Sequence, residues 1–123
     1  MLARAPSPDS QAWLLTQLGM TLARRGRHDE ALNVLDMAVE LEPSPLVTLE
    51  AYARGVTVHC AAGSLETASA VAATARMLAS DAGLGEALGE IYLELFRETG
   101  KLALLDEAFA CFRLTSLEDA LPP

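Results

Sequence analysis

The chain has 123 residues, of which 51% are apolar, and a formal net charge of −8 at pH 7. This length suits one domain with its own core, and no stretch approaches the ~18 uninterrupted apolar residues of a membrane span. An acidic chain with few cations lacks the basic clusters that nucleic acid or an anionic membrane surface requires, so we expect neither as a partner.

Three glycines, Gly26, Gly63 and Gly100, follow one another at intervals of 37 residues. Each separates two apolar stretches with helical periodicity. A fixed period of this length is typical of helical repeats, in which hairpins stack and bury a continuous core. The sequence therefore predicts an all-α fold of three antiparallel helical hairpins with a short C-terminal turn of helix.

The first hairpin follows residues 1–8, which contain proline and serine and should be disordered or extended. We therefore place a single α-helical repeat domain at residues 9–123, with Asp9 or Ser10 capping the first helix. Four leucines of that helix recur at helical spacing and predict one buried stripe: Leu14, Leu15, Leu18 and Leu22. The second helix follows Gly26 and ends before Pro43.

The second and third hairpins follow the same plan. The fourth helix is rich in alanine, which lets neighbouring helices approach closely, and the fifth has the clearest 3.6-residue period. In the sixth helix, the residues expected to share the buried side are Leu102, Leu105, Phe109 and Phe112. Ser116, with Asp119 three residues later, should cap one further short turn.

The first hairpin carries a specific motif. Leu18-Gly19 precedes Leu22, and three later positions complete the pattern, Ala31, Leu35 and Ala38, before Pro43. With Leu15 in the tryptophan position, residues 12–45 resemble a tetratricopeptide repeat. Residues 46–114 carry degenerate versions, so related helical repeats stay an alternative there. The resemblance implies a right-handed superhelix whose first helices line a concave groove for an extended or helical peptide.

Carried over by that resemblance, the groove would present ten side chains: Trp13, Gln17, Met20, Arg24, Glu50, Arg54, Thr57, Glu90, Glu94 and Glu98. Relatives that grip the acidic tail of heat-shock chaperones use a ring of Lys, Arg and Asn in this groove. Here Thr16 and Met20 occupy the first two such places, which disfavours that subfamily.

Two groups of side chains have both a functional and a purely structural interpretation. Glu86, Glu90, Glu94 and Glu98 form an acidic row on the fifth helix, either a solvated outer face or a strip that receives Lys or Arg from a partner. Trp13 and Met20 lie away from the leucine stripe and could anchor a partner. Alternatively, the N-terminal residues or a second copy of the chain covers them.

No catalytic or metal site is predicted. His28 and His59 lack further ligands at the right spacing, and His59 and Cys60 point about 100° apart on a helix, which does not suit a nucleophile and its base. We therefore expect no enzyme activity and no cofactor. Cys60 and Cys111 lie in predicted helices as unbridged thiols, which favours a cytoplasmic location.

These observations favour a non-catalytic protein–protein interaction module: an adaptor, chaperone or assembly scaffold that holds a protein or peptide, including one with basic residues, in a concave groove. A regulatory or sensor domain of a larger bacterial protein, for example a peptide-sensing transcription regulator, is the alternative. Apolar residues of the sixth helix point in several directions (Leu104, Phe109, Cys111 and Phe112), so we also expect a homodimer or hetero-complex.

Overall fold

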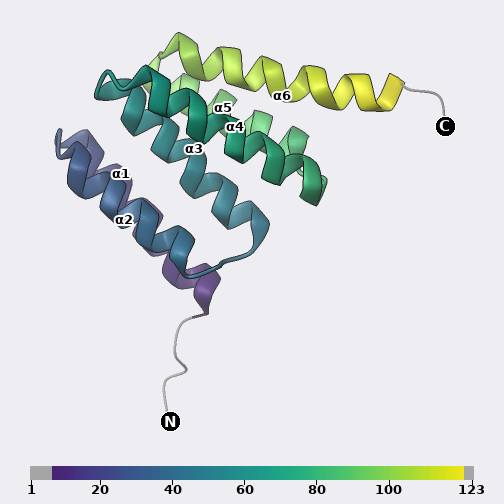
Figure 1. Cartoon of the computed structure of the whole chain (residues 1–123). Helices are drawn as coiled ribbons and strands as arrows, with labels where there is room; N and C mark the ends of the chain where they lie inside the picture. Colours follow the sequence, from purple (N-terminus) through teal and green to yellow (C-terminus); the bar gives the residue numbers. More distant parts are fainter. Residues whose placement is uncertain (1–6, 121–123) are drawn as a thin grey trace.

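The computed structural model describes residues 7–120, and the side chains of residues 7–113. Over that range the chain forms six α-helices and no strand. The helices are α1 (Pro8–Arg24), α2 (His28–Glu40), α3 (Pro45–Ala61), α4 (Leu65–Ala82), α5 (Gly85–Thr99) and α6 (Leu102–Ala120). They pair as three antiparallel hairpins, α1–α2, α3–α4 and α5–α6 (Figure 1). The predicted all-α hairpin fold is confirmed.

The hairpins stack side by side in two layers. The first helices contact in sequence, α1 with α3 and α3 with α5, and α2 and α4 each also pack on the first helix of the next hairpin. The pair α1–α2 lies at one end of the stack and α6 lies at the other (Figure 1). The first helices α1, α3 and α5 thus form one layer, which we call the inner layer.

The three glycines spaced 37 residues apart all adopt the same backbone conformation. Gly26, Gly63 and Gly100 all have left-handed φ angles, of 76°, 80° and 71°. Other residues adopt this conformation at a cost, whereas glycine has no Cβ to clash. At the first two turns the amide after the glycine closes the helix, by donating from Arg27 to the Leu22 carbonyl and from Ser64 to the His59 carbonyl. Each hairpin therefore turns at the predicted glycine.

Both predicted ends of the helical region differ from the structure. The cap of α1 is Ser7, whose Oγ accepts from the Ser10 amide at 3.1 Å, because Pro8 starts the helix one residue before Asp9. Residues 1–6 of the predicted extended segment lie outside the described residues. At the other end, α6 runs without a break to Ala120, so the separate turn expected at Ser116 is a continuation of α6.

The predicted leucine stripe of α1 was wrong in its direction. Leu14 and Leu18 are 58% and 47% exposed, and Leu15 and Leu22 are half-buried. The buried side of α1 instead contains Ala12, Thr16, Gly19 and Met20. The physical reason is close packing: a Cβ at Gly19 would lie 2.9 Å from Cγ of Leu35, so α1 approaches α2 through its small residues.

The largest hydrophobic core joins α3, α4, α5 and α6. The predicted alanine face of α4 lies in it, with Ala68, Ala72, Ala75 and Ala79 all buried. In α6 the buried side is Leu104, Ala108 and Cys111, whereas Leu102 and Phe109 are 69% and 54% exposed. The expected register of α6 was therefore wrong by one position, since Leu104 and Ala108 precede Leu105 and Phe109.

Helix α5 repeats the packing of α1. A Cβ at Gly89 would lie 2.6 Å from Cε1 of Phe112, so α5 crosses its partner α6 at a glycine, as α1 crosses α2. Leu88-Gly89 repeats Leu18-Gly19 of the first hairpin, and Tyr92 stands where the first hairpin has Leu22. Tyrosine is the residue that the repeat pattern usually has at this position. This match was not predicted from the sequence, although it can be found there.

Candidate partner-binding surface

The inner layer of α1, α3 and α5 carries the side chains expected in the groove. Trp13 is 52% exposed, Arg24, Glu90, Glu94 and Glu98 are exposed, and Gln17, Glu50 and Arg54 are half-buried. Two expected groove residues are not available: Met20 is only 4% exposed, and Thr57 is buried as well. The prediction of Met20 as an exposed anchor was therefore wrong.

The reason for the burial of Met20 is the neighbouring α3. Helix α1 contacts both α2 and α3, so its buried side is wide enough to include Met20 and Thr16 as well as the small residues that face α2. Trp13, seven residues before Met20, lies at the edge of that side and keeps half of its surface exposed. One of the two predicted apolar anchors remains.

Trp13 borders an open hollow of about 430 Å³ where the start of α1 meets the start of α3. The other residues that line it are Asp9, Ser10, Leu14 and Val47. The side chain of Asp9 fixes this junction, because its Oδ1 accepts from the Ser44 amide at 2.7 Å, across 35 positions of sequence. The hollow therefore has apolar walls and a carboxylate at its rim.

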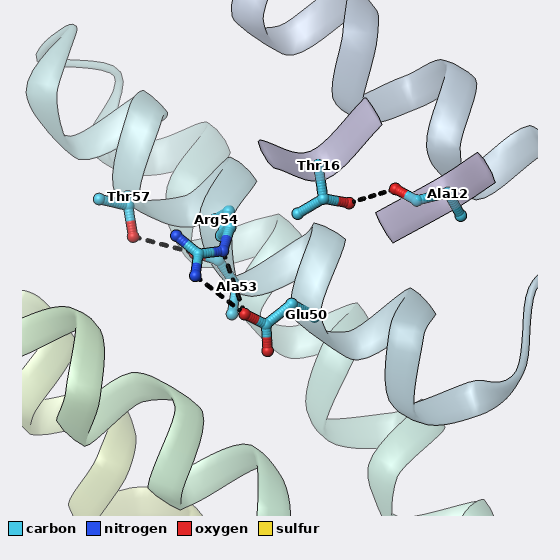
Figure 2. A network of polar contacts seen from close by, with 6 residues as sticks. All are labelled: Ala12, Thr16, Glu50, Ala53, Arg54 and Thr57. Atoms are coloured by element: carbon cyan, nitrogen blue, oxygen red, sulfur yellow. Dashed lines mark hydrogen bonds and ion pairs between the residues drawn. The ribbon is translucent and has the colours of Figure 1, made fainter. Parts of the chain in front are cut away.

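The centre of the inner layer is an ion pair on α3. Arg54 donates to Oε1 of Glu50 from Nε at 3.1 Å, and its Nη2 lies 3.0 Å from the same oxygen (Figure 2). The two side chains are only 13% and 29% exposed, so the pair is partly shielded from water. The charge of Arg54 is therefore already neutralised by Glu50 before any partner binds.

The buried threonines beside this pair are satisfied locally. Thr16 donates to the Ala12 carbonyl at 2.8 Å and Thr57 to the Ala53 carbonyl at 3.0 Å, each one turn back along its own helix (Figure 2). Such bonds leave no donor for a ligand. Thr57 supports the surface without contacting what binds to it.

The acidic row of α5 is exposed to solvent. Glu86, Glu90, Glu94 and Glu98 are all exposed, on the side of α5 opposite the buried residues Leu88, Tyr92 and Leu95. None of the four forms an ion pair with another described residue. Four like charges at this spacing repel one another, and cations from another molecule would relieve that repulsion.

The thiols and the phenol of the core are held in their neutral forms. Burial raises the pKa of the Cys60 thiol, with a smaller opposing effect of Lys101, and burial raises the pKa of Cys111 to about 11. The pKa of Tyr92 is also raised, first by burial and then by the nearby Glu107 carboxylate. A nucleophilic thiol requires a lowered pKa, so neither cysteine is activated.

A smaller hollow, of about 220 Å³, lies where α3, α4 and α6 meet, and Cys60 and Glu107 are among its lining residues. Glu107 is paired with Arg76 across α4 and α6. Among the described residues, no three His, Cys, Asp or Glu side chains are grouped so that they could hold a metal ion. Cys60 and Cys111 form no disulfide with any described residue.

No helix in the part of the chain that the structure describes is long and apolar enough to span a bilayer. The family model of the tetratricopeptide repeat matches residues 12–55, which include most of the first hairpin and the first part of α3. No curated protein and no solved structure matches the chain. Residues 12–55 are thus a tetratricopeptide repeat segment, of a kind that generally mediates protein–protein interaction and is typically non-catalytic.

Proposed function

We propose that the three hairpins together form one protein-interaction module. This module holds a partner segment against α1, α3 and α5. The observation that carries this function is the exposure of Trp13 beside an apolar hollow. A half-exposed tryptophan contributes a large apolar surface at little entropic cost when a partner covers it.

The charges of the surface favour a partner with basic residues. The acidic row of α5 has no ion pair within the described chain, and the whole chain carries a net charge of −8. Lys or Arg side chains of a partner would find unpaired carboxylates there, which accelerates association and fixes orientation more than it adds affinity. Arg24, at the end of α1, would attract an acidic group at the other end of the bound partner segment.

The role is that of an adaptor, chaperone or assembly scaffold, without chemistry of its own. Its binding energy comes from covering Trp13 and the hollow, and its specificity comes from the acidic row. Because the Arg54–Glu50 pair is already satisfied, it contributes shape to the surface and little charge.

The experiment is a comparative affinity purification from the native source with the unchanged protein, Trp13→Ala and Met77→Ala. Met77 is 70% exposed on α4 and lies outside the proposed surface, so its variant is the matched control. We expect a partner that the unchanged protein and Met77→Ala retain equally and that Trp13→Ala loses. Equal recovery by Trp13→Ala would refute the role of this surface.

A further inference from the structure

The outer side of α1 is an apolar face that no described part of the chain covers. Leu14, Leu18, Thr21 and Arg25 are all exposed. The spacing of the first three places them on one side of α1, and Arg25 is the C-cap residue that directly follows the helix. We call these four residues the α1 outer face. It lies opposite the side that packs on α2 and α3.

The third hairpin shows what such a position looks like when it is covered. Leu18 and Leu88 each directly precede a glycine at which a first helix crosses its own partner helix. Leu88 is completely buried, in the core that α3, α4, α5 and α6 share, whereas Leu18 keeps 47% of its surface exposed. The α1 outer face is therefore equivalent to a surface that inside the stack is covered by neighbouring helices.

A second uncovered apolar face lies on α6, at the opposite end of the stack (Figure 1). Leu102, Asp106, Phe109 and Arg113 are exposed, at a spacing of four, three and four residues, which places them on one side of α6. We call these four the α6 outer face. The two faces thus have the same length, and each has two large apolar residues.

We propose that the α1 outer face of one copy of the chain packs on the α6 outer face of a second copy, head to tail. The two helices would run antiparallel, as α2 and α3 do within the chain. Phe109 then contacts Leu18 and, at the edge of the contact, Leu14, which also borders the hollow beside Trp13. Leu102 covers the stem of Arg25, the residue that caps α1, because residues 18 and 25 are separated by as many positions as residues 109 and 102.

The charges of the two faces complement each other in this orientation. The carboxylate of Asp106 comes within reach of Arg25, and neither side chain has an ion pair within the described chain. An opposite-charge pair beside an apolar centre fixes the register of such a contact.

A contact between two different faces of the same chain is not complete in a dimer. Each open assembly keeps one α1 outer face and one α6 outer face free, so association continues past two copies, into a ring or a filament, and the average mass rises with concentration. A pairing of two α1 outer faces would instead stop at a dimer. The two arrangements therefore predict different masses.

The experiment measures mass by light scattering over a wide concentration range for the unchanged protein, Leu18→Glu, Phe109→Glu and the control Met77→Glu. All three side chains are about half exposed or more, so we expect the helical signal and melting temperature of each variant to be retained. The unchanged protein and Met77→Glu should form species larger than dimers. Leu18→Glu and Phe109→Glu should each associate at least about tenfold more weakly.

An equimolar mixture of Leu18→Glu and Phe109→Glu provides the decisive case. The first variant keeps its α6 outer face and the second keeps its α1 outer face, so the mixture should form a 1:1 dimer and nothing larger. Three results would overturn the head-to-tail contact: an unchanged protein that stays monomeric, a mixture that stays monomeric, or association lost in Leu18→Glu but intact in Phe109→Glu. The last result would mean that the α1 outer face pairs with a second α1 outer face, whereas a monomeric unchanged protein would leave the face to a different occupant.

Discussion

The aromatic ring of Phe112 fills the space that a side chain at Gly89 would occupy, with only 2.6 Å between Cε1 and the position of a Cβ. This contact sets the distance between α5 and α6. We therefore expect Gly89→Ala to lower the free energy of unfolding by about 1–2 kcal/mol, although alanine favours the helix, because the ring must move. Chemical denaturation measures the change.

Gly55 provides the matched control for that substitution. It also lies inside a helix, but a Cβ there would meet nothing within 4 Å, so Gly55→Ala should raise the free energy of unfolding by about 0.5–1 kcal/mol. If both variants shifted stability in the same direction, the close contact between α5 and Phe112 would not be what holds the hairpin together.

The phenol of Tyr92 is completely buried, and its hydroxyl has no hydrogen-bond partner among the described residues. A buried, unpaired hydroxyl is costly, so we expect Tyr92→Phe to raise the free energy of unfolding by about 1 kcal/mol. Tyr52→Phe, at a half-buried position, should change stability little. A loss of stability in Tyr92→Phe alone would show that the hydroxyl makes a bond in solution.

Stability should fall at alkaline pH because of Cys111. Burial raises the pKa of its thiol to about 11, whereas an unfolded thiol has a pKa of about 8.5. The folded chain therefore keeps a proton that the unfolded chain loses, and stability decreases between these two values, by on the order of 1.4 kcal/mol per pH unit. Below pH 8 this contribution is fully present.

Urea denaturation at a series of pH values tests this dependence, with Cys111→Ala as the comparison. The variant should show a flatter decline between pH 9 and 10, whatever its stability at neutral pH. Above about pH 10 the raised pKa of Tyr92 adds a further decline in both proteins. An identical slope in the two proteins below pH 10 would contradict the burial of the Cys111 thiol.

The turns and the alanine face were predictable from sequence because each depends on residues close together in the chain. A left-handed turn favours glycine, so the positions of Gly26, Gly63 and Gly100 predicted the turns of all three hairpins. The buried side of α1 was not predictable, because that helix has large apolar residues on both sides. Met20 is buried and Leu18 is exposed because α3 packs on one side of α1 and not on the other.

In the candidate surface, too, local features were predictable from the sequence and features that depend on distant residues were not. Trp13 was predicted correctly as an exposed residue, but its value as an anchor depends on the hollow that it forms with Val47 of α3. No local pattern links residues 34 positions apart. In contrast, the Leu-Gly-x2-Tyr pattern of α5 could have been found, because it shares Leu-Gly with α1 and has the tyrosine of the general repeat pattern three residues after the glycine.

Trp13 is the only tryptophan of the chain, so its fluorescence reports on the proposed surface alone. The most direct measurement is a fluorescence titration. A tryptophan-free fragment of the partner recovered by affinity purification is added to the protein, and the emission of Trp13 is followed. We predict a saturable blue shift as the ring leaves water, weakened when the four glutamates of α5 are replaced by glutamine. A complex that forms while the emission of Trp13 stays unchanged would contradict the account.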